Sequence, residues 1–272
     1  MVDPRFRYDV NCSILFTELD LLDRAGAAKA AGFRAVEFWW PFPAAVPSPS
    51  DVDAFVRSVR DEGVRLAGLN FFAGDMPGGE RGVLSDPARS VEFRDNVDVA
   101  VEIADKLGCK TFNALYGNRV EGVPESEQDE VARENLALAA KAASQIGAAV
   151  VVEPLSGAPA YPIKTAAEAL AVIQRVSGEA GVDNLALLAD LYHLAVNGDD
   201  PAEVISRHAE RIGHVQIADA PGRNEPGTGD LDLQGLLDLL ADNGYSGYIG
   251  LEYKPSGASA DSFEWLPRDL RA

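Results

Sequence analysis

Short apolar runs alternate along the chain with longer segments in which apolar residues recur at helical spacing. The short runs are rich in β-branched and aromatic residues, which is typical of buried parallel strands. They predict eight strands, at Tyr8–Ser13, Ala35–Trp39, Arg65–Asn70, Thr111–Leu115, Ala149–Glu153, Leu185–Asp190, His214–Ala218 and Tyr248–Tyr253.

The intervening segments predict helices, and four of them end just before Gly32, Gly63, Gly108 or Gly147, where glycine can adopt the left-handed conformation that stops a helix. The predicted helices are Leu19–Ala31, Ser50–Glu62, Val91–Leu107, Glu125–Ile146, Thr165–Val176, Pro201–Ile212 and Leu233–Asn243, with a weaker one after Ser259. Eight alternating β/α units in 272 residues indicate one (β/α)8 barrel domain, residues 1–272, rather than a doubly wound sheet.

Charge and composition narrow the classes of partner. Lys and Arg number 24 against 43 Asp and Glu, a net charge of −19, which disfavours binding to nucleic acid. Neither a secretory leader nor an apolar run of membrane-spanning length is apparent, and the two cysteines form no CxxC pair. We therefore expect a cytoplasmic protein with no membrane contact, and association into a homo-oligomer stays open.

The polar residues at the ends of the last four predicted strands carry the candidate chemistry. Glu153, Asp190, Gln216 and Glu252 fall there, and the C-terminal ends of the strands form the active-site face of such barrels. Three carboxylates converging with an amide would repel one another without a cation. Because all four offer oxygen, they predict one hard divalent ion, Mg²⁺ or Mn²⁺.

For other polar residues near this face, the sequence predicts a role less specifically. His193 lies three residues past Asp190 at the same mouth, whereas His214 lies one layer below Gln216 and is expected to support it or to belong to the core. Arg223 lies in a Gly- and Pro-rich loop after the seventh strand. The glycine-rich loop 74–82 is expected to be either a lid or a surface turn.

Several stretches resemble the hydroxypyruvate isomerase and 2-oxo-tetronate isomerase group of the xylose isomerase-like barrel superfamily. They are NCSILFTE (11–18), GFRAVEFWWPF (32–42), GERG (79–82), EFRD (92–95), EPL (153–155), DLYH (190–193), RIGHVQIADAPGRNEPGTGD (211–230) and GYIGLEYKP (247–255). They span nearly the whole chain, and the last three are the most specific.

The resemblance implies the same four metal ligands and implies that Glu153 and Glu252 also transfer protons. It places His193 and Arg223 at positions that hold substrate oxygens in related epimerases. The chain departs from those epimerases by carrying Gln216 where they usually have histidine and Pro159 where they have a further glutamate, which favours the hydroxy-acid isomerases. Ser156 replaces the asparagine usual in the group and leaves the fine substrate preference open.

These observations predict a metal-dependent isomerase of a small hydroxy-oxo acid, acting on hydroxypyruvate and 2-hydroxy-3-oxopropanoate through an enediolate. Such a substrate carries a carboxylate, for which Arg223 and Lys254 are the candidate cations. The alternatives are a 2-oxo-tetronate isomerase, a ketose 3-epimerase, an abasic-site endonuclease and a non-enzymatic binding module. The endonuclease needs a histidine-rich zinc cluster, whereas the chain has only three histidines.

Overall fold

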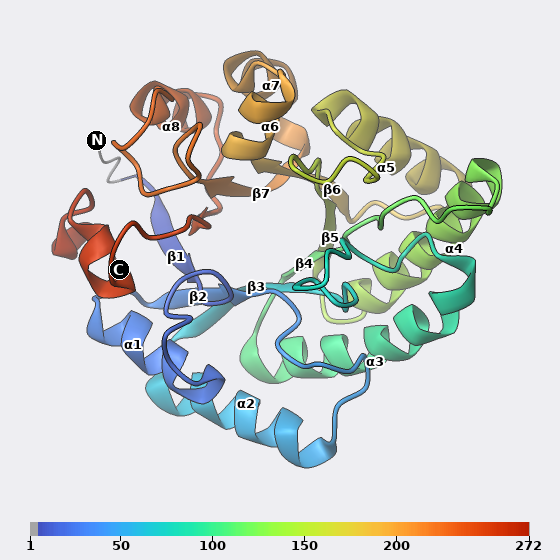
Figure 1. The fold of residues 1–272 in the computed structure, drawn as a ribbon, viewed down its shortest axis with the longest axis horizontal. Coiled ribbons are helices and arrows are strands. Elements are labelled where there is room, and N and C mark those ends of the chain that lie inside the picture. The colour runs from blue at the N-terminus through green and yellow to red at the C-terminus, as the bar shows by residue number, and fades with distance from the viewer. Residues whose placement is uncertain (1–4, 272) are drawn as a thin grey trace.

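The computed structural model describes residues 5–271, and its eight parallel strands pair in chain order to close a barrel (Figure 1). The first and last strands pair with each other, since Arg7 is in register with Tyr248. The strands are β1 (Arg7–Asn11), β2 (Ala35–Phe38), β3 (Arg65–Asn70), β4 (Thr111–Asn113), β5 (Ala149–Val152), β6 (Leu185–Asp190), β7 (Ile212–Ile217) and β8 (Tyr248–Leu251). The predicted barrel is confirmed.

The helices form a ring around the barrel (Figure 1). They are α1 (Arg24–Ala30), α2 (Pro49–Glu62), α3 (Ser90–Leu107), α4 (Glu125–Ser144), α5 (Ala166–Ala180), α6 (Leu191–Asn197), α7 (Pro201–His208) and α8 (Leu233–Asp242). The four predicted glycine stops all have positive φ; at Gly63 and Gly108, for example, φ is 71°. Within residues 5–271, no helix combines the length and the apolar character needed to cross a bilayer.

The structure differs from the predicted helices in three places. No helix was predicted directly after β6, but Asp190 caps the helix α6, which therefore begins at the mouth of the barrel. The helix predicted to run to Ile212 ends at His208, because Ile212 already pairs with Leu187 as the first residue of β7. The weak helix expected after Ser259 is a short 3-10 helix, Ser259–Phe263.

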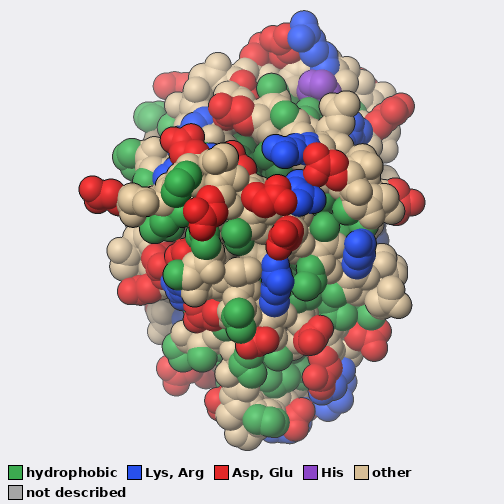
Figure 2. Space-filling view, turned by 90° about the vertical axis from the view of Figure 1, so that its right-hand side faces the viewer, with side chains coloured by type: hydrophobic (Ala, Val, Ile, Leu, Met, Phe, Trp, Pro, Cys, Tyr) green, Lys and Arg blue, Asp and Glu red, His purple; other side chains and the backbone are tan. Residues whose placement is uncertain are grey.

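Polar side chains occupy much of the barrel interior toward its C-terminal mouth. Buried there are Asp9, Asn11, Glu37, Asn70, Asn113, His214 and Gln216, each less than a tenth exposed. Interior positions of such barrels are usually filled by branched apolar residues, so this polar layer is costly unless its members satisfy one another. The outer surface is different in character: on the face shown in Figure 2, acidic and basic side chains are interspersed.

Candidate active site

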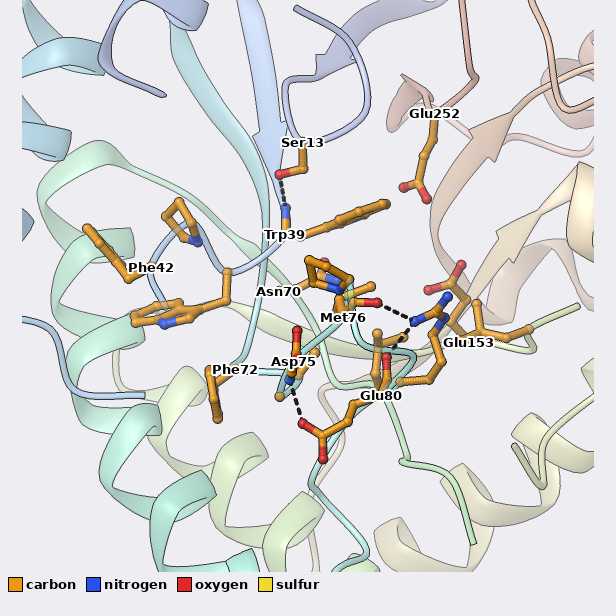
Figure 3. A pocket seen from close by; sticks show the side chains of 18 of the residues that line it. Ser13, Trp39, Phe42, Asn70, Phe72, Asp75, Met76, Glu80, Glu153 and Glu252 are labelled. Atoms are coloured by element: carbon orange, nitrogen blue, oxygen red, sulfur yellow. Dashed lines mark hydrogen bonds between the residues drawn. The ribbon is translucent and has the colours of Figure 1, made fainter. Parts of the chain in front are cut away.

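A cavity of about 960 Å³ opens at the C-terminal mouth of the barrel. Its walls come from segments that follow most of the strands, including Trp39 after β2, Phe72 after β3, Glu153 after β5 and Glu252 after β8. The carboxyl groups of Glu153 and Glu252 both point into the space between them (Figure 3). The cavity is therefore acidic at its floor and partly aromatic on one side.

Hydrogen-bond donors hold one carboxylate oxygen of Glu153 and one of Asp190. The second oxygen of each carboxylate has no hydrogen-bond partner in the described part of the chain. Glu153 is the first residue after β5, and its Oε2 accepts a hydrogen bond of 2.7 Å from Asn113 Nδ2. Asp190 is the last residue of β6, and its Oδ1 accepts hydrogen bonds from the backbone N–H groups of Tyr192 and His193. Glu153 Oε1 and Asp190 Oδ2 are buried and have no hydrogen-bond partner among the described residues.

The amide of Gln216 is oriented by two carboxylates. Its Nε2 donates to Glu37 Oε1 over 2.7 Å and to Glu252 Oε2 over 2.5 Å. Because the nitrogen of the amide faces both of these groups, its oxygen faces away from them. Gln216 Oε1 is consequently a third buried oxygen without a partner in the described structure.

Glu37 is the anchor of the network below the cavity. Besides Gln216, its Oε1 accepts a hydrogen bond from Asn11 Nδ2, and its Oε2 lies 2.6 Å from His214 Nε2. Burial alone would lower the pKa of His214, but Glu37 outweighs it and raises the pKa to about 9. The support expected from His214 is therefore indirect, through Glu37 to Gln216.

Glu252 joins this network to the loop after β7. Its Oε2 accepts hydrogen bonds from Asn11 and Gln216, and its Oε1 lies 2.6 Å from Arg223 Nη2. The same guanidinium nitrogen is 3.8 Å from Asp190 Oδ2. Burial raises the pKa of Glu252 to about 8, although Arg223 opposes the shift. Arg223 thus partly neutralises an acidic cluster that would otherwise repel itself.

The residues present fit a divalent metal. Glu153, Asp190 and Gln216 each contribute a buried oxygen that has no hydrogen-bond partner within residues 5–271, and Glu252 lies against Gln216. Burial raises the pKa of Asp190 to about 6, and burial together with Glu252 and Asp190 raises that of Glu153 well above its ordinary value. Buried carboxylates that repel one another are stabilised by binding either a proton or a cation. Because all the available ligand atoms are oxygens, the site suits a hard cation.

His193 is held in one tautomer. The backbone N–H of Ser156 donates to His193 Nδ1 over 3.1 Å, so Nδ1 is unprotonated and the ring proton resides on Nε2. Burial lowers the pKa of His193 well below its ordinary value, with Arg223 and Arg81 adding to the effect, and the ring is neutral. Nε2 lies 3.6 Å from Asp190 Oδ2 and 4.0 Å from Glu153 Oε1. His193 therefore offers an N–H donor beside the acidic cluster rather than a metal ligand.

The two cations expected near the substrate differ in their surroundings. Arg223 is held by its loop, in which buried Asp219 accepts hydrogen bonds from three backbone N–H groups, those of Ala220, Gly227 and Leu231. Lys254 lines the cavity but is exposed, at its outer edge. The third histidine, His208, ends helix α7 and does not line the cavity.

Four residues orient a predicted site residue, a role that the sequence did not predict for them: Asn11, Glu37, Asn113 and Ser156. A signal was available for Glu37, because a carboxylate in the middle of a buried strand needs a partner. The other three are small polar residues at strand ends or in a loop, and their partners become apparent only when the strands are placed side by side.

Comparison with known families shows to which of them the chain belongs. Residues 25–268 match the model of the family described as xylose isomerase-like TIM barrel. The chain belongs to this family.

Two relatives place the chain more narrowly within the family. A Streptomyces coelicolor protein named "Putative hydroxypyruvate isomerase" is 55% identical over 98% of this chain and 97% of its own length. A 2-oxo-tetronate isomerase from Cupriavidus necator is 34% identical, covering 96% of this chain and 97% of the relative. The chain is therefore a member of the hydroxypyruvate and 2-oxo-tetronate isomerase group.

A solved structure from Brucella melitensis, described as an AP endonuclease of family 2, shares the fold. It superposes with a TM-score of 0.85 at 34% identity, covering 96% of this chain and 98% of that one. The histidine-rich zinc cluster that an abasic-site endonuclease was expected to need has no counterpart among the described residues. Of the three histidines, only His193 lines the cavity.

Proposed function

We propose that this aldose–ketose isomerase interconverts hydroxypyruvate and 2-hydroxy-3-oxopropanoate through an enediolate. The observation that carries the proposal is a pair of buried carboxyl groups that line one cavity and point toward each other, Glu153 from the end of β5 and Glu252 from the end of β8 (Figure 3). A small substrate between them would have a proton acceptor near one carbon and a donor near the other.

The reaction needs one carbon-bound proton to leave and one to arrive. A carboxylate removes a proton from C3 of hydroxypyruvate, and the electron pair moves to O2 to give the enediolate. A carboxylic acid then protonates C2, while the proton of the C3 hydroxyl passes to O2 and leaves the aldehyde. Burial raises the pKa of both carboxyl groups, that of Glu252 to about 8, which favours their taking up and releasing a proton.

Glu153, Asp190, Gln216 and Glu252 would hold a divalent metal, Mg²⁺ or Mn²⁺ by the chemistry of the donors. When bound, the ion would polarise the substrate's carbonyl and hydroxyl oxygens and stabilise the charge of the enediolate. His193 would contribute its Nε2–H to a substrate oxygen, because Ser156 fixes the opposite nitrogen as an acceptor. Arg223 and Lys254 add positive charge to the same cavity.

A 2-oxo-tetronate is the closest alternative substrate. It needs the same chemistry on one more carbon, and the Cupriavidus necator relative carries that name. A cavity of about 960 Å³ has room for either acid. A ketose 3-epimerase is a weaker alternative, because Pro159 stands where those enzymes have a further glutamate.

Substrate choice is tested by incubating the protein with hydroxypyruvate, a 2-oxo-tetronate and D-psicose in separate reactions with Mg²⁺ or Mn²⁺. Proton NMR follows each reaction. We expect kcat/KM to be highest for hydroxypyruvate, with slower conversion of the four-carbon acid. Turnover of D-psicose with neither acid converted would contradict the proposal and favour the epimerase.

A further inference from the structure

The cavity contains a guanidinium group that no part of the proposed chemistry uses. Arg81 lies in the loop between β3 and α3 and lines the cavity that contains Glu153 and Glu252. Its Nη1 donates to the backbone carbonyls of Met76, over 2.9 Å, and Glu80, over 2.6 Å, drawn as dashed lines in Figure 3. No carboxylate among the described residues forms an ion pair with it.

We infer that Arg81 binds the carboxylate of the substrate and thereby selects acids over neutral sugars. The inference rests on the proposed isomerisation of a hydroxy-oxo acid. Both protons of Nη1 are directed to backbone carbonyls, which leaves Nε and Nη2 without an acceptor among the described residues. This edge of a guanidinium forms the two-pronged donor that matches a carboxylate.

The other arginines around the cavity are engaged differently. Arg223 is paired with Glu252 at 2.6 Å, and Arg89 is paired with both Glu80 and Glu92 at 2.6 Å. Arg24 donates to the carbonyls of Leu19 and Cys12. A carboxylate brought to Arg223 or Arg89 would have to compete with a carboxylate already bound there.

The position and burial of Arg81 suit this role better than those of Lys254. Arg81 lines the same cavity as Glu153, His193 and Glu252. Lys254 is exposed at the outer edge of the cavity, where water screens its charge. Arg81 is half-buried, so its interaction with an anion is screened less.

The loop that carries Arg81 is held in place. The Gly82 N–H donates to the carbonyl of Ala73 and closes the base of the loop. Glu80 Oε1 is bound to Arg89 at the start of α3. A Cβ at Gly82, where φ is 107°, would lie 2.1 Å from the carbonyl oxygen of Leu115, so only glycine permits this close approach. These contacts keep the guanidinium directed toward the cavity before a substrate arrives.

The test compares an acid with a neutral analogue in matched variants. We expect Arg81→Met to lower kcat/KM for hydroxypyruvate by about 10- to 100-fold, the range of a charged hydrogen bond, and to change it for glyceraldehyde by less than about 3-fold. Arg81→Lys should recover part of the lost kcat/KM for hydroxypyruvate, since lysine restores the positive charge but not the two parallel N–H donors. Arg60→Met removes one charge from the exposed face of α2 and should leave both substrates unaffected.

Binding of tartronate, a non-reacting dicarboxylate, provides a readout that does not depend on turnover. Calorimetry should show weaker tartronate binding to Arg81→Met than to the wild type, with unchanged metal content. Equal losses for acid and neutral substrates would mean that Arg81 only shapes the loop. An unchanged acid reaction, with loss in Lys254→Met instead, would also overturn the inference. Failure of the wild type to convert any hydroxy-oxo acid would instead contradict the proposed function.

Discussion

Glu153→Gln and Glu252→Gln should each lower kcat by ~100-fold or more, because a general acid or base contributes about that much to a proton transfer. Glutamine keeps an oxygen for the metal and nearly the same volume, but it can neither accept nor release a proton at neutral pH. Both side chains are almost completely buried and contact other polar groups, so the isosteric change is preferable to alanine.

Two measurements distinguish a loss of proton transfer from a loss of metal binding or folding. Calorimetry with Mn²⁺ should show that both variants still bind one ion per chain. Glu203→Gln, on the exposed side of α7, serves as the matched control and should retain full activity. If Glu252→Gln turned over at nearly the wild-type rate, Glu252 could not be one of the two proton-transferring groups.

Removal of the metal should abolish turnover, and Mg²⁺ or Mn²⁺ should restore it. The reason is that three buried oxygens, on Glu153, Asp190 and Gln216, have no hydrogen-bond partner in the described part of the chain. The measurement is activity after exhaustive chelation, with the residual metal content determined, and again after each ion is returned. Full activity in the metal-free protein would contradict this part of the account.

The same metal should bind more tightly as pH rises from about 6 to about 8. Burial raises the pKa of Asp190 to about 6 and that of Glu252 to about 8, so protons compete with the ion for these oxygens below those values. For each proton that the metal displaces on binding, the affinity for the metal should rise by about tenfold per pH unit. Calorimetry across this range, in buffers of different ionisation enthalpy, measures both the affinity and the protons released.

The pKa shifts also fix the sign of the stability effect. A carboxyl group whose pKa is raised on folding makes the metal-free protein less stable as pH rises from its ordinary pKa through the raised value. A bound metal ion offsets this loss of stability, because its charge favours the ionised carboxylates. The difference in Tm between metal-loaded and metal-free protein should therefore grow between pH 5.5 and pH 8.5.

Much of the barrel could be predicted because each of its units is encoded locally. Apolar runs of strand length, helical periodicity and the glycine stops at Gly63 and Gly108 depend on a few neighbouring residues. Asp190 shows the limit of this reasoning. Its carboxylate was predicted to face the mouth, but the same group also caps α6, a helix that was not predicted.

The four proposed ligands could be predicted because each stands at or near the end of a strand, and the barrel brings those ends together. The network that orients them could not be. Glu37 and Gln216 are 179 residues apart, and their contact depends on the way β2 faces β7 across the barrel. Arg81 was missed for a related reason, since only the folded loop shows which arginines already have a carboxylate partner.

Isomerisation in D₂O tests most directly whether a proton, rather than a hydride, moves between the two carbons of the substrate. Hydroxypyruvate is converted for a single turnover with metal-loaded protein, and NMR measures deuterium at C2 of the 2-hydroxy-3-oxopropanoate formed. A reaction without protein corrects for spontaneous exchange. If Glu153 and Glu252 transfer protons that exchange with solvent, deuterium should appear at C2 faster than in that control. Complete transfer of a C3 hydrogen of the substrate to C2, with no deuterium there, would indicate a hydride shift and would contradict the enediolate mechanism.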